Sequence, residues 1–310
     1  MDETLEYARN LVVAKRNDML QNARFNLTVQ EQRVILYSVA QIKPEDSYLK
    51  EYEFDIKDFY KMIGWEKESY SEFKQMLKAL SDKSWWITVK DKKGEEWESV
   101  VRWFTTVRAN KKSGKVTVMF HHDMFPYLIE LSKQFSEKGE YYTTYQLKYI
   151  LAMQSKFSPR LYETLKSYQQ NNVRWFFRVE DLQFLLCDCD KDGKPIVPET
   201  WRNFAEFKRR VLEPAVKEIN EYTDLKIAYQ AEKEGIKYTK IHFMMLNKTA
   251  GELRGTEKKI EVTLDGEQQT VKIKADDPFA ELLTQHRQAV EEERKLKEGI
   301  LSWIDTKEPK

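Results

Sequence analysis

The sequence Phe-Asp-Ile-Lys-Asp-Phe at residues 54–59 returns in modified form as Phe-Arg-Val-Glu-Asp-Leu at residues 177–182. A second pair follows in the same order, because Ser-Glu-Phe-Lys at 71–74 is answered by Ala-Glu-Phe-Lys at 205–208. Each pair is followed by apolar residues that alternate with polar ones, the pattern of a β-hairpin. Two matches in the same order, each with a hairpin after them, indicate the internal duplication of one structural unit.

The first copy of this unit begins with a helix. Thr28 and Glu31 have the spacing of a capping box, which predicts a helix from there to Ile42. The pattern then predicts a strand, two helices and a β-rich section, at 52–54, 55–64, 70–83 and 85–120.

The second copy repeats this order. Ser158 followed by Pro159 is typical of an N-cap and the first position of a helix. The pattern predicts helices over 144–153, from 158, from 179 and over 203–221, and strands over 175–177, 225–230 and 238–244. Helix, strand, helix, helix and hairpin is the order of a winged helix. We therefore expect an α+β protein of two tandem winged-helix domains, residues 1–140 and 141–247.

Residues 248–310 are predicted to form an accessory tail. Alternating apolar residues at 260–264 and 271–273 flank Asp265-Gly266, which predicts a hairpin. Asp277 and Pro278 are typical of the start of a final helix. We expect no chemistry in this tail.

The basic charge is local. Residues 60–120 hold 13 Lys/Arg against 8 Asp/Glu, a net +5, whereas residues 251–310 hold 11 against 14, a net −3. A local excess of this kind suits a surface that faces phosphates, although any lysine-rich surface fluctuates in the same way.

Several features point to a cytoplasmic protein without a membrane partner. No run approaches the roughly 18 apolar residues that a membrane helix needs, and the first 18 residues lack the apolar core of a signal peptide. The two cysteines, Cys187 and Cys189, have a spacing that seldom forms a disulfide framework, which fits a reducing compartment.

The last helix of a helix-turn-helix enters the major groove and presents its polar face to bases and phosphates. On a helical wheel, the helix over 70–83 places Lys74, Gln75 and Lys78 opposite its apolar side. These long hydrogen-bond donors are what a DNA-facing helix needs. An ordinary amphipathic helix with solvated lysines explains the same pattern.

The helix over 203–221 is the richer candidate. Its polar residues predicted to bind DNA are Asn203, Lys208, Arg209, Arg210 and Lys217. Arginine suits bidentate contact with guanine or phosphate. Pro214 lacks the N–H that would bond the Arg210 carbonyl, so we expect a kink or a late start. The following hairpin carries Lys233, Lys237 and Lys240, which suit a wing along the DNA backbone. Alternatively, Glu206 and Glu213 pair with the arginines on the helix surface.

Catalytic and metal-binding motifs receive little support. Residues 188–199 match the spacing of an EF-hand calcium loop, but Pro195 removes a backbone donor and no partner loop exists, so an acidic turn explains them equally well. His121 and His122 are adjacent and lack the His-hydrophobic-His pattern of rolling-circle nicking enzymes. No Gly-rich phosphate loop, Gly-x-Ser-x-Gly or His-Glu-x-x-His motif occurs. We expect neither an enzyme nor a cofactor.

Three segments resemble one known family. Residues 26–33 (NLTVQEQR), 156–163 (KFSPRLYE) and 207–220 (FKRRVLEPAVKEIN) are similar to iteron-binding plasmid replication initiators of the RepE, RepA and Pi-protein type. The similarity spans about residues 10–246. The tail and the inserted acidic loop lie outside it.

The resemblance implies a non-enzymatic initiator that binds directly repeated iterons in duplex DNA at a theta-type origin. It implies a homodimer, formed through the first domain, that represses its own promoter at an inverted repeat. The first domain would make auxiliary DNA contacts and the second the main base contacts, which places Lys208, Arg209 and Arg210 on bases. Host initiator and helicase are the implied partners.

Two other functions stay open from the sequence alone. A winged-helix transcriptional regulator would share the fold and fail to support replication. A winged-helix protein-interaction module would leave the basic face idle and bind duplex weakly and without specificity.

Overall fold

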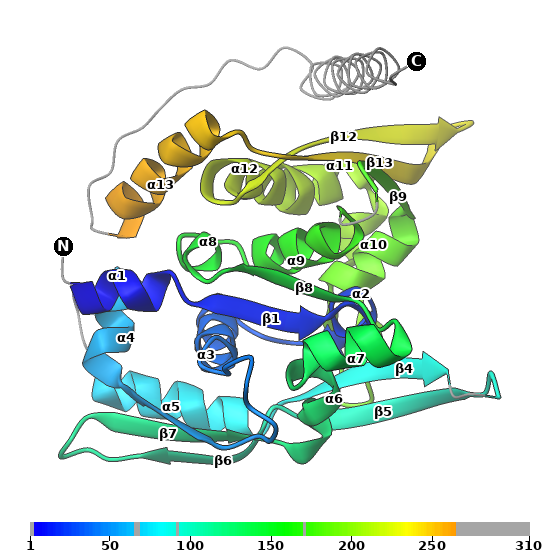
Figure 1. The fold of residues 1–310 in the computed structure, drawn as a ribbon. Coiled ribbons are helices and arrows are strands. Elements are labelled where there is room, and N and C mark those ends of the chain that lie inside the picture. Colours follow the sequence, from blue (N-terminus) through cyan, green and yellow to red (C-terminus); the bar gives the residue numbers. More distant parts are fainter. Residues whose placement is uncertain (1–2, 65–68, 91–92, 170–171, 265–310) are drawn as a thin grey trace, which may run out of the picture.

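The computed structural model describes residues 3–64, 69–90, 93–169 and 172–264. Two winged-helix units lie one above the other in Figure 1, and helix α9 (Phe157–Gln169), which begins the second unit, lies on the side that faces the first. The first unit forms the lower half of the view and the second unit the upper half.

The two units have the same topology. In each, the strand between the first two helices pairs with the second strand of the hairpin, so the sheets have the orders β3-β7-β6 and β9-β13-β12. The first unit consists of α3 (Val29–Val39), β3 (Glu51–Asp55), α4 (Ile56–Met62), α5 (Tyr70–Ser81), β6 (Phe104–Ala109) and β7 (Lys115–Phe120). The second consists of α9, β9 (Arg174–Arg178), α10 (Val179–Leu186), α11 (Phe204–Phe207), a π-helical turn (Lys208–Leu212), α12 (Glu213–Tyr222), β12 (Leu225–Glu234) and β13 (Lys237–Asn247). The predicted duplication is confirmed down to the strand pairing.

Further elements surround this frame. A second sheet in the first unit has the order β2-β4-β5, and β1 pairs with β8 in an antiparallel ribbon. Their bounds are β1 (Val12–Arg16), β2 (Arg24–Phe25), β4 (Ser84–Lys90), β5 (Glu96–Arg102) and β8 (Tyr142–Gln146). The short helices are α1 (Glu3–Arg9), α2 (Asn17–Asn22), η1 (His122–Met124), α6 (Phe125–Leu128), α7 (Leu131–Lys138), α8 (Lys148–Leu151) and η2 (Glu199–Arg202). A small hairpin, β10 (Asp188–Cys189) and β11 (Pro195–Ile196), precedes η2, and α13 (Ala250–Leu264) follows β13.

Local capping sets the start of the helices. The hydroxyl of Thr28 accepts from the Glu31 N–H at 3.3 Å, and the Glu31 carboxylate accepts from the Thr28 N–H at 2.7 Å, which is the capping box expected for α3. Asp55 caps α4, and Ser69 caps α5. Each cap satisfies an N–H that the first helical turn leaves without a partner.

The helix expected over 144–153 is wrong in its first half. Residues Tyr142–Gln146 form β8, and only Lys148–Leu151 are helical within that range. Threonine and tyrosine favour strands, and β1, which the sequence pattern did not reveal, supplies the partner. Val13 lies opposite Tyr145, and both side chains are buried.

The strand expected over 260–264 is also wrong, because these residues end helix α13. Ile260 and Leu264 are four residues apart, so the spacing that suggested alternation also fits one face of a helix, and both are buried. The helix begins at a capping box formed by Thr249 and Glu252. The other expected tail elements, at 271–273 and from Asp277, lie outside the described residues.

The discontinuity expected at Pro214 takes the form of a π-helical turn. Helical backbone runs from Phe204 to Tyr222, with the turn Lys208–Leu212 between α11 and α12. The wider turn accommodates a ring that has no N–H to donate and that collides with an ordinary helical carbonyl.

Buried apolar side chains of both units join one continuous core, to which Phe73, Leu77, Phe207 and Phe243 contribute. Among the described residues, no helix is both long and apolar enough to cross a membrane.

Candidate nucleic-acid interface

Helix α5 has the two faces that its sequence predicts. Phe73, Leu77 and Leu80 are buried, and the Phe73 ring packs edge-on against Phe59 with 5.3 Å between centroids. Lys74, Gln75 and Lys78 are exposed on the outer face. The core therefore fixes the helix from behind and leaves its donors accessible.

The helix through α11, the π turn and α12 is anchored in the same way. Phe207, Val211, Leu212, Ala215 and Ile219 are fully buried. The predicted DNA-binding residues of this helix, Asn203, Lys208, Arg209, Arg210 and Lys217, are all exposed. Asn203 also caps α11, since its side-chain oxygen accepts from the Ala205 N–H at 3.0 Å. The structure thus gathers these four cations and Asn203 on one accessible helix, and their contact with DNA stays a prediction.

Glu206 binds both arginines on this surface. Its Oε2 lies 2.8 Å from Arg209 Nη2 and 2.7 Å from Arg210 Nε. The hydrogen bonds from Arg209 and Arg210 lower the pKa of the Glu206 carboxyl. The pairing expected as an alternative to DNA contact is therefore present for Glu206, whereas Glu213 pairs with Lys208 at 3.5 Å and not with an arginine. Exposed pairs of this kind are weak and screened by salt, so a phosphate or a guanine edge can replace the carboxylate.

The hairpin β12–β13 is tied to the start of that helix by a ring contact that sequence reasoning missed. Tyr238 stacks on Phe204 with 4.2 Å between centroids. Lys233 lies over the Tyr238 ring, and Lys237 is exposed. Lys240 is half-buried and pairs with Glu232 at 3.1 Å. Two aromatic residues 34 positions apart give no signal that sequence periodicity can detect.

The junction between the two units holds buried charges that sequence reasoning also missed. The Arg160 guanidinium donates to the backbone carbonyls of Ala23 and Leu185 and lies over the Phe25 ring, 4.1 Å from its centroid. Burial lowers the pKa of Arg160 to about 10. A buried cation bonded to carbonyls of both units joins them at α9.

A second buried group joins β1 and β8 to α9. Lys15 Nζ lies 2.5 Å from a carboxylate oxygen of Glu163, and the Tyr145 hydroxyl donates to the same carboxylate. Burial lowers the pKa of Lys15 against the opposing effect of Glu163. Because both charges are almost fully buried, removing one would leave the other without its partner.

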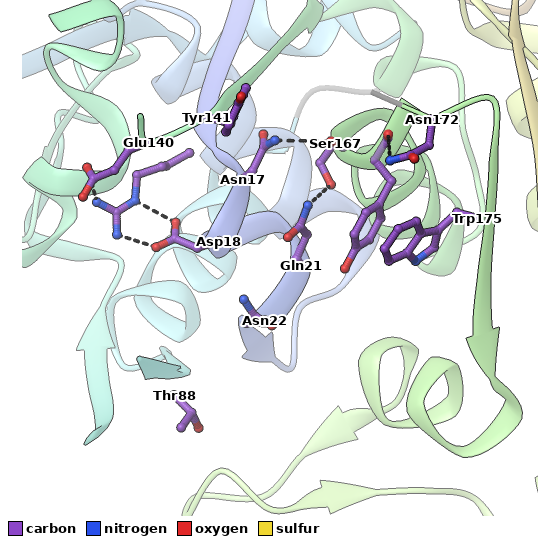
Figure 2. Close-up of a pocket in the computed structure, with 12 residues that line it drawn as sticks. Asn17, Asp18, Gln21, Asn22, Thr88, Glu140, Tyr141, Ser167, Asn172 and Trp175 are labelled. Carbon is purple, nitrogen blue, oxygen red and sulfur yellow. Dashed lines mark hydrogen bonds and ion pairs between the residues drawn. The ribbon is translucent and has the colours of Figure 1, made fainter. Parts of the chain in front are cut away.

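A polar cleft opens at this junction, between α2 and the end of α9 (Figure 2). Asn17 donates to the Ser167 carbonyl at 3.2 Å, and Gln21 donates to the Ser167 hydroxyl at 3.0 Å. Arg16 is held by Asp18 and Glu140. These side chains bind one another, and the lining mixes one arginine with two carboxylates, so the cleft does not have the charge of a phosphate site.

The segment that resembles a calcium loop is a hairpin in the structure. Asp188 binds Lys156 at 2.7 Å, and Asp190 Oδ1 accepts backbone N–H bonds from Asp192 and Lys194. Within the described part of the chain, the group of three ligand-type side chains that converge is His121, His122 and Asp123, at an exposed turn. The acidic-turn interpretation of 188–199 therefore fits the geometry better than the calcium interpretation.

Comparison with known proteins identifies both units. A family model described as "Initiator Replication protein, WH1" matches residues 12–166, and one described as "Initiator Rep protein, WH2" matches residues 179–245. A replication initiation protein of Escherichia coli is 25% identical over 228 residues, 70% of this chain and 64% of that protein. An uncharacterized 27.6 kDa protein of Escherichia coli is 27% identical over 134 residues, 43% of this chain and 49% of that protein.

A solved structure shows the same fold. The Pi initiator protein, crystallised in complex with iteron DNA, matches with a TM-score of 0.58 and 21% identity, over 77% of this chain and 98% of that one. The matches to the two curated relatives span less than two thirds of their lengths. With both winged-helix models matched in order over most of its length, the chain belongs to the family of initiator replication proteins.

Proposed function

We propose that this protein starts plasmid replication by binding directly repeated iterons in duplex DNA. Its exposed recognition helices, α5 and α11–α12, would each enter a major groove. The observation that carries the proposal is the row Lys208, Arg209 and Arg210, held outward on a helix whose other face is fully buried. Cations in such a position supply both phosphate attraction and bidentate base contacts.

The second unit is the main reading domain in this proposal, and residues 1–140 supply dimerisation and auxiliary contacts. Two features support this division. The recognition helix of the second unit, α11–α12, carries arginines, which discriminate bases, whereas α5 carries Lys74, Gln75 and Lys78. The wing of the second unit is stacked on its recognition helix through Tyr238 and Phe204, so helix and wing would meet the DNA as one rigid surface.

Binding would exchange ion pairs without any covalent step. Glu206 holds Arg209 and Arg210 in the free protein, and DNA phosphates or guanine edges would take its place. The bound protein would then open or remodel the origin for a host initiator and helicase. As a homodimer it would occupy an inverted repeat and repress its own promoter. We place this activity in the cytoplasm and assign no cofactor.

A replication assay separates the initiator from a winged-helix regulator. The gene is supplied in trans to a plasmid whose sole origin carries the direct repeats found beside it. Autonomous replication that disappears in the Arg209→Ala, Arg210→Ala variant supports the initiator. Repression of a reporter promoter without any replication would assign the protein to regulation.

A winged-helix interaction module is the second alternative. It would bind repeat and scrambled duplexes with equal, weak affinity, and the double arginine variant would behave like the wild type.

A further inference from the structure

Two segments outside the winged-helix frame both cross from the second unit to the first. Helix α13 follows β13 and lies beyond the residues that the second family model matches. The β10–β11 hairpin is inserted between α10 and α11. At each contact with the first unit lies a glycine in the left-handed region of backbone conformation, Gly64 after α4 with φ +72° and Gly193 in the hairpin with φ +75°.

Helix α13 is anchored at its start on the second unit. Lys248 Nζ donates to the Asn220 carbonyl at 2.6 Å and to the Thr256 hydroxyl at 2.7 Å. Glu252 pairs with Lys226 of β12 at 3.3 Å. These contacts bind the first turns of α13 to α12 and β12.

The far end of α13 rests on the first unit. Glu257 pairs with Lys148 of α8, between the two units, at 3.0 Å, and Ile260 and Leu264 are buried in the common core. A Cβ added at Gly64, at the end of α4, would overlap the backbone of Leu264, including its carbonyl oxygen. The two backbones therefore meet at a distance that only glycine allows.

The β10–β11 hairpin makes an equivalent contact elsewhere. Asp188 binds Lys156, at the start of α9, and β10 lies against β2 of the first unit. A Cβ added at Gly193 would overlap the indole ring of Trp86, on β4. Figure 1 shows α13 ending near α1 and α4 at the left of the molecule, while β4 lies at the right.

We propose that α13 and the β10–β11 hairpin are two straps that hold the recognition helices α5 and α11–α12 at one separation. The buried bonds of Arg160 and Glu163 join the units along α9, and a junction along one axis resists rotation about that axis less than attachments on two sides of it do. Under the proposed function, on which this inference rests, the straps would set the spacing between the two DNA segments that one molecule can contact at once. Spacing of recognition helices fixes the spacing of their sites on DNA.

The first test measures the separation without DNA. Spin labels at Ala79→Cys on α5 and Lys217→Cys on α12 report the distance between the helices by pulsed electron resonance. Both label sites are exposed, whereas Cys187 and Cys189 are buried. We expect one narrow distance distribution for the wild type and a broader one for Gly64→Ala with Gly193→Ala.

A matched control separates strain from contact. Gly94 and Gly139 also have positive φ, +84° and +68°, but an added Cβ meets nothing within 4 Å. Gly94→Ala with Gly139→Ala therefore carries similar backbone strain without a clash between units, and its distribution should stay narrow. If the strap variant fails to fold, Leu264→Ala with Trp86→Ala trims the contact of each strap with the first unit and adds no atoms. It should broaden the distribution in the same direction.

The second test uses a DNA site selected by the wild type from a random duplex library. Five base pairs, about half a helical turn, are inserted between its two contacted segments. Wild-type affinity should fall about 100-fold, as expected when two bases can no longer be reached, and the affinity of the strap variant should fall much less. Distributions equally narrow in the strap and control variants would overturn the proposal. If the distance distribution broadens in the strap variant but no DNA site can be selected, the role of the straps is supported and the proposed function is refuted.

Discussion

The side-chain amide of Gln32 donates a hydrogen bond of 3.0 Å to the backbone carbonyl of Lys156. This bond joins residues 26–33 to residues 156–163, two of the segments through which the sequence resembles plasmid initiators. In the same region Arg33 donates to the Met153 carbonyl at 2.7 Å. Two of the three family-like segments therefore lie where the units meet, and the third, residues 207–220, forms the exposed helix of the second unit.

Replacing both arginines of that helix should abolish sequence-specific binding. In Arg209→Ala with Arg210→Ala, the absence of each bidentate bond to a base should cost about 1–3 kcal/mol of discrimination. Fluorescence anisotropy with repeat and scrambled duplexes measures the difference. Arg202→Ala is the control, because Arg202 is also an exposed arginine but precedes the helix. A double variant that kept its preference would move the recognition surface elsewhere.

Removing the negative charge at Glu206 should strengthen DNA binding severalfold. Glu206→Gln frees Arg209 and Arg210 from the carboxylate that holds them and removes repulsion from phosphates. Titration at fixed salt gives the affinity, and Glu199→Gln serves as the comparison, since Glu199 pairs only with Arg202 among the ion pairs described. Weaker binding by Glu206→Gln would mean that the carboxylate orients the arginines for contact.

Truncating the buried arginine at the junction should destabilise the fold. Arg160→Ala leaves the carbonyls of Ala23 and Leu185 without their donor and opens a cavity beside Phe25. We expect the free energy of unfolding, measured with urea, to fall by about 3–5 kcal/mol. Arg178→Ala, at an exposed site, should change it by less than about 0.5 kcal/mol. Equal effects would show that the junction bonds contribute nothing.

The thiol of Cys187 should resist alkylation at neutral pH. Burial raises its pKa to about 11, so the native protein holds the proton while an unfolded chain has already lost it near pH 9. Iodoacetamide should react slowly with the native protein at pH 8 and faster as the pH rises toward 11. The chain in urea should reach its maximal rate at lower pH. A native rate at pH 8 matching that in urea would contradict this burial.

The duplicated unit was readable from the sequence because its signals are local. The Thr28 and Glu31 capping box acts within one helical turn, and the apolar spacing of Phe73, Leu77 and Leu80 shows which face of α5 is buried. The exposure of Arg209 and Arg210 followed from the same spacing.

The features that sequence reasoning missed depend on distant partners. Strand β8 exists because β1, more than 120 residues earlier, pairs with it. The strand predicted at 260–264 is the end of helix α13, because Ile260 and Leu264 fit either period. The stack of Tyr238 on Phe204 and the contact of Gly193 with Trp86 bring together residues whose proximity only the fold determines.

The central claim is that this chain reads duplex DNA by sequence. The most direct measurement is the affinity of the wild-type protein for duplex carrying the direct repeats beside its gene, against scrambled duplex, across a salt series. We predict tight, repeat-dependent binding with several proteins on each array. The log–log salt slope should be about −0.9 for each phosphate neutralised. Equal and weak binding to both duplexes at every salt concentration would contradict the account.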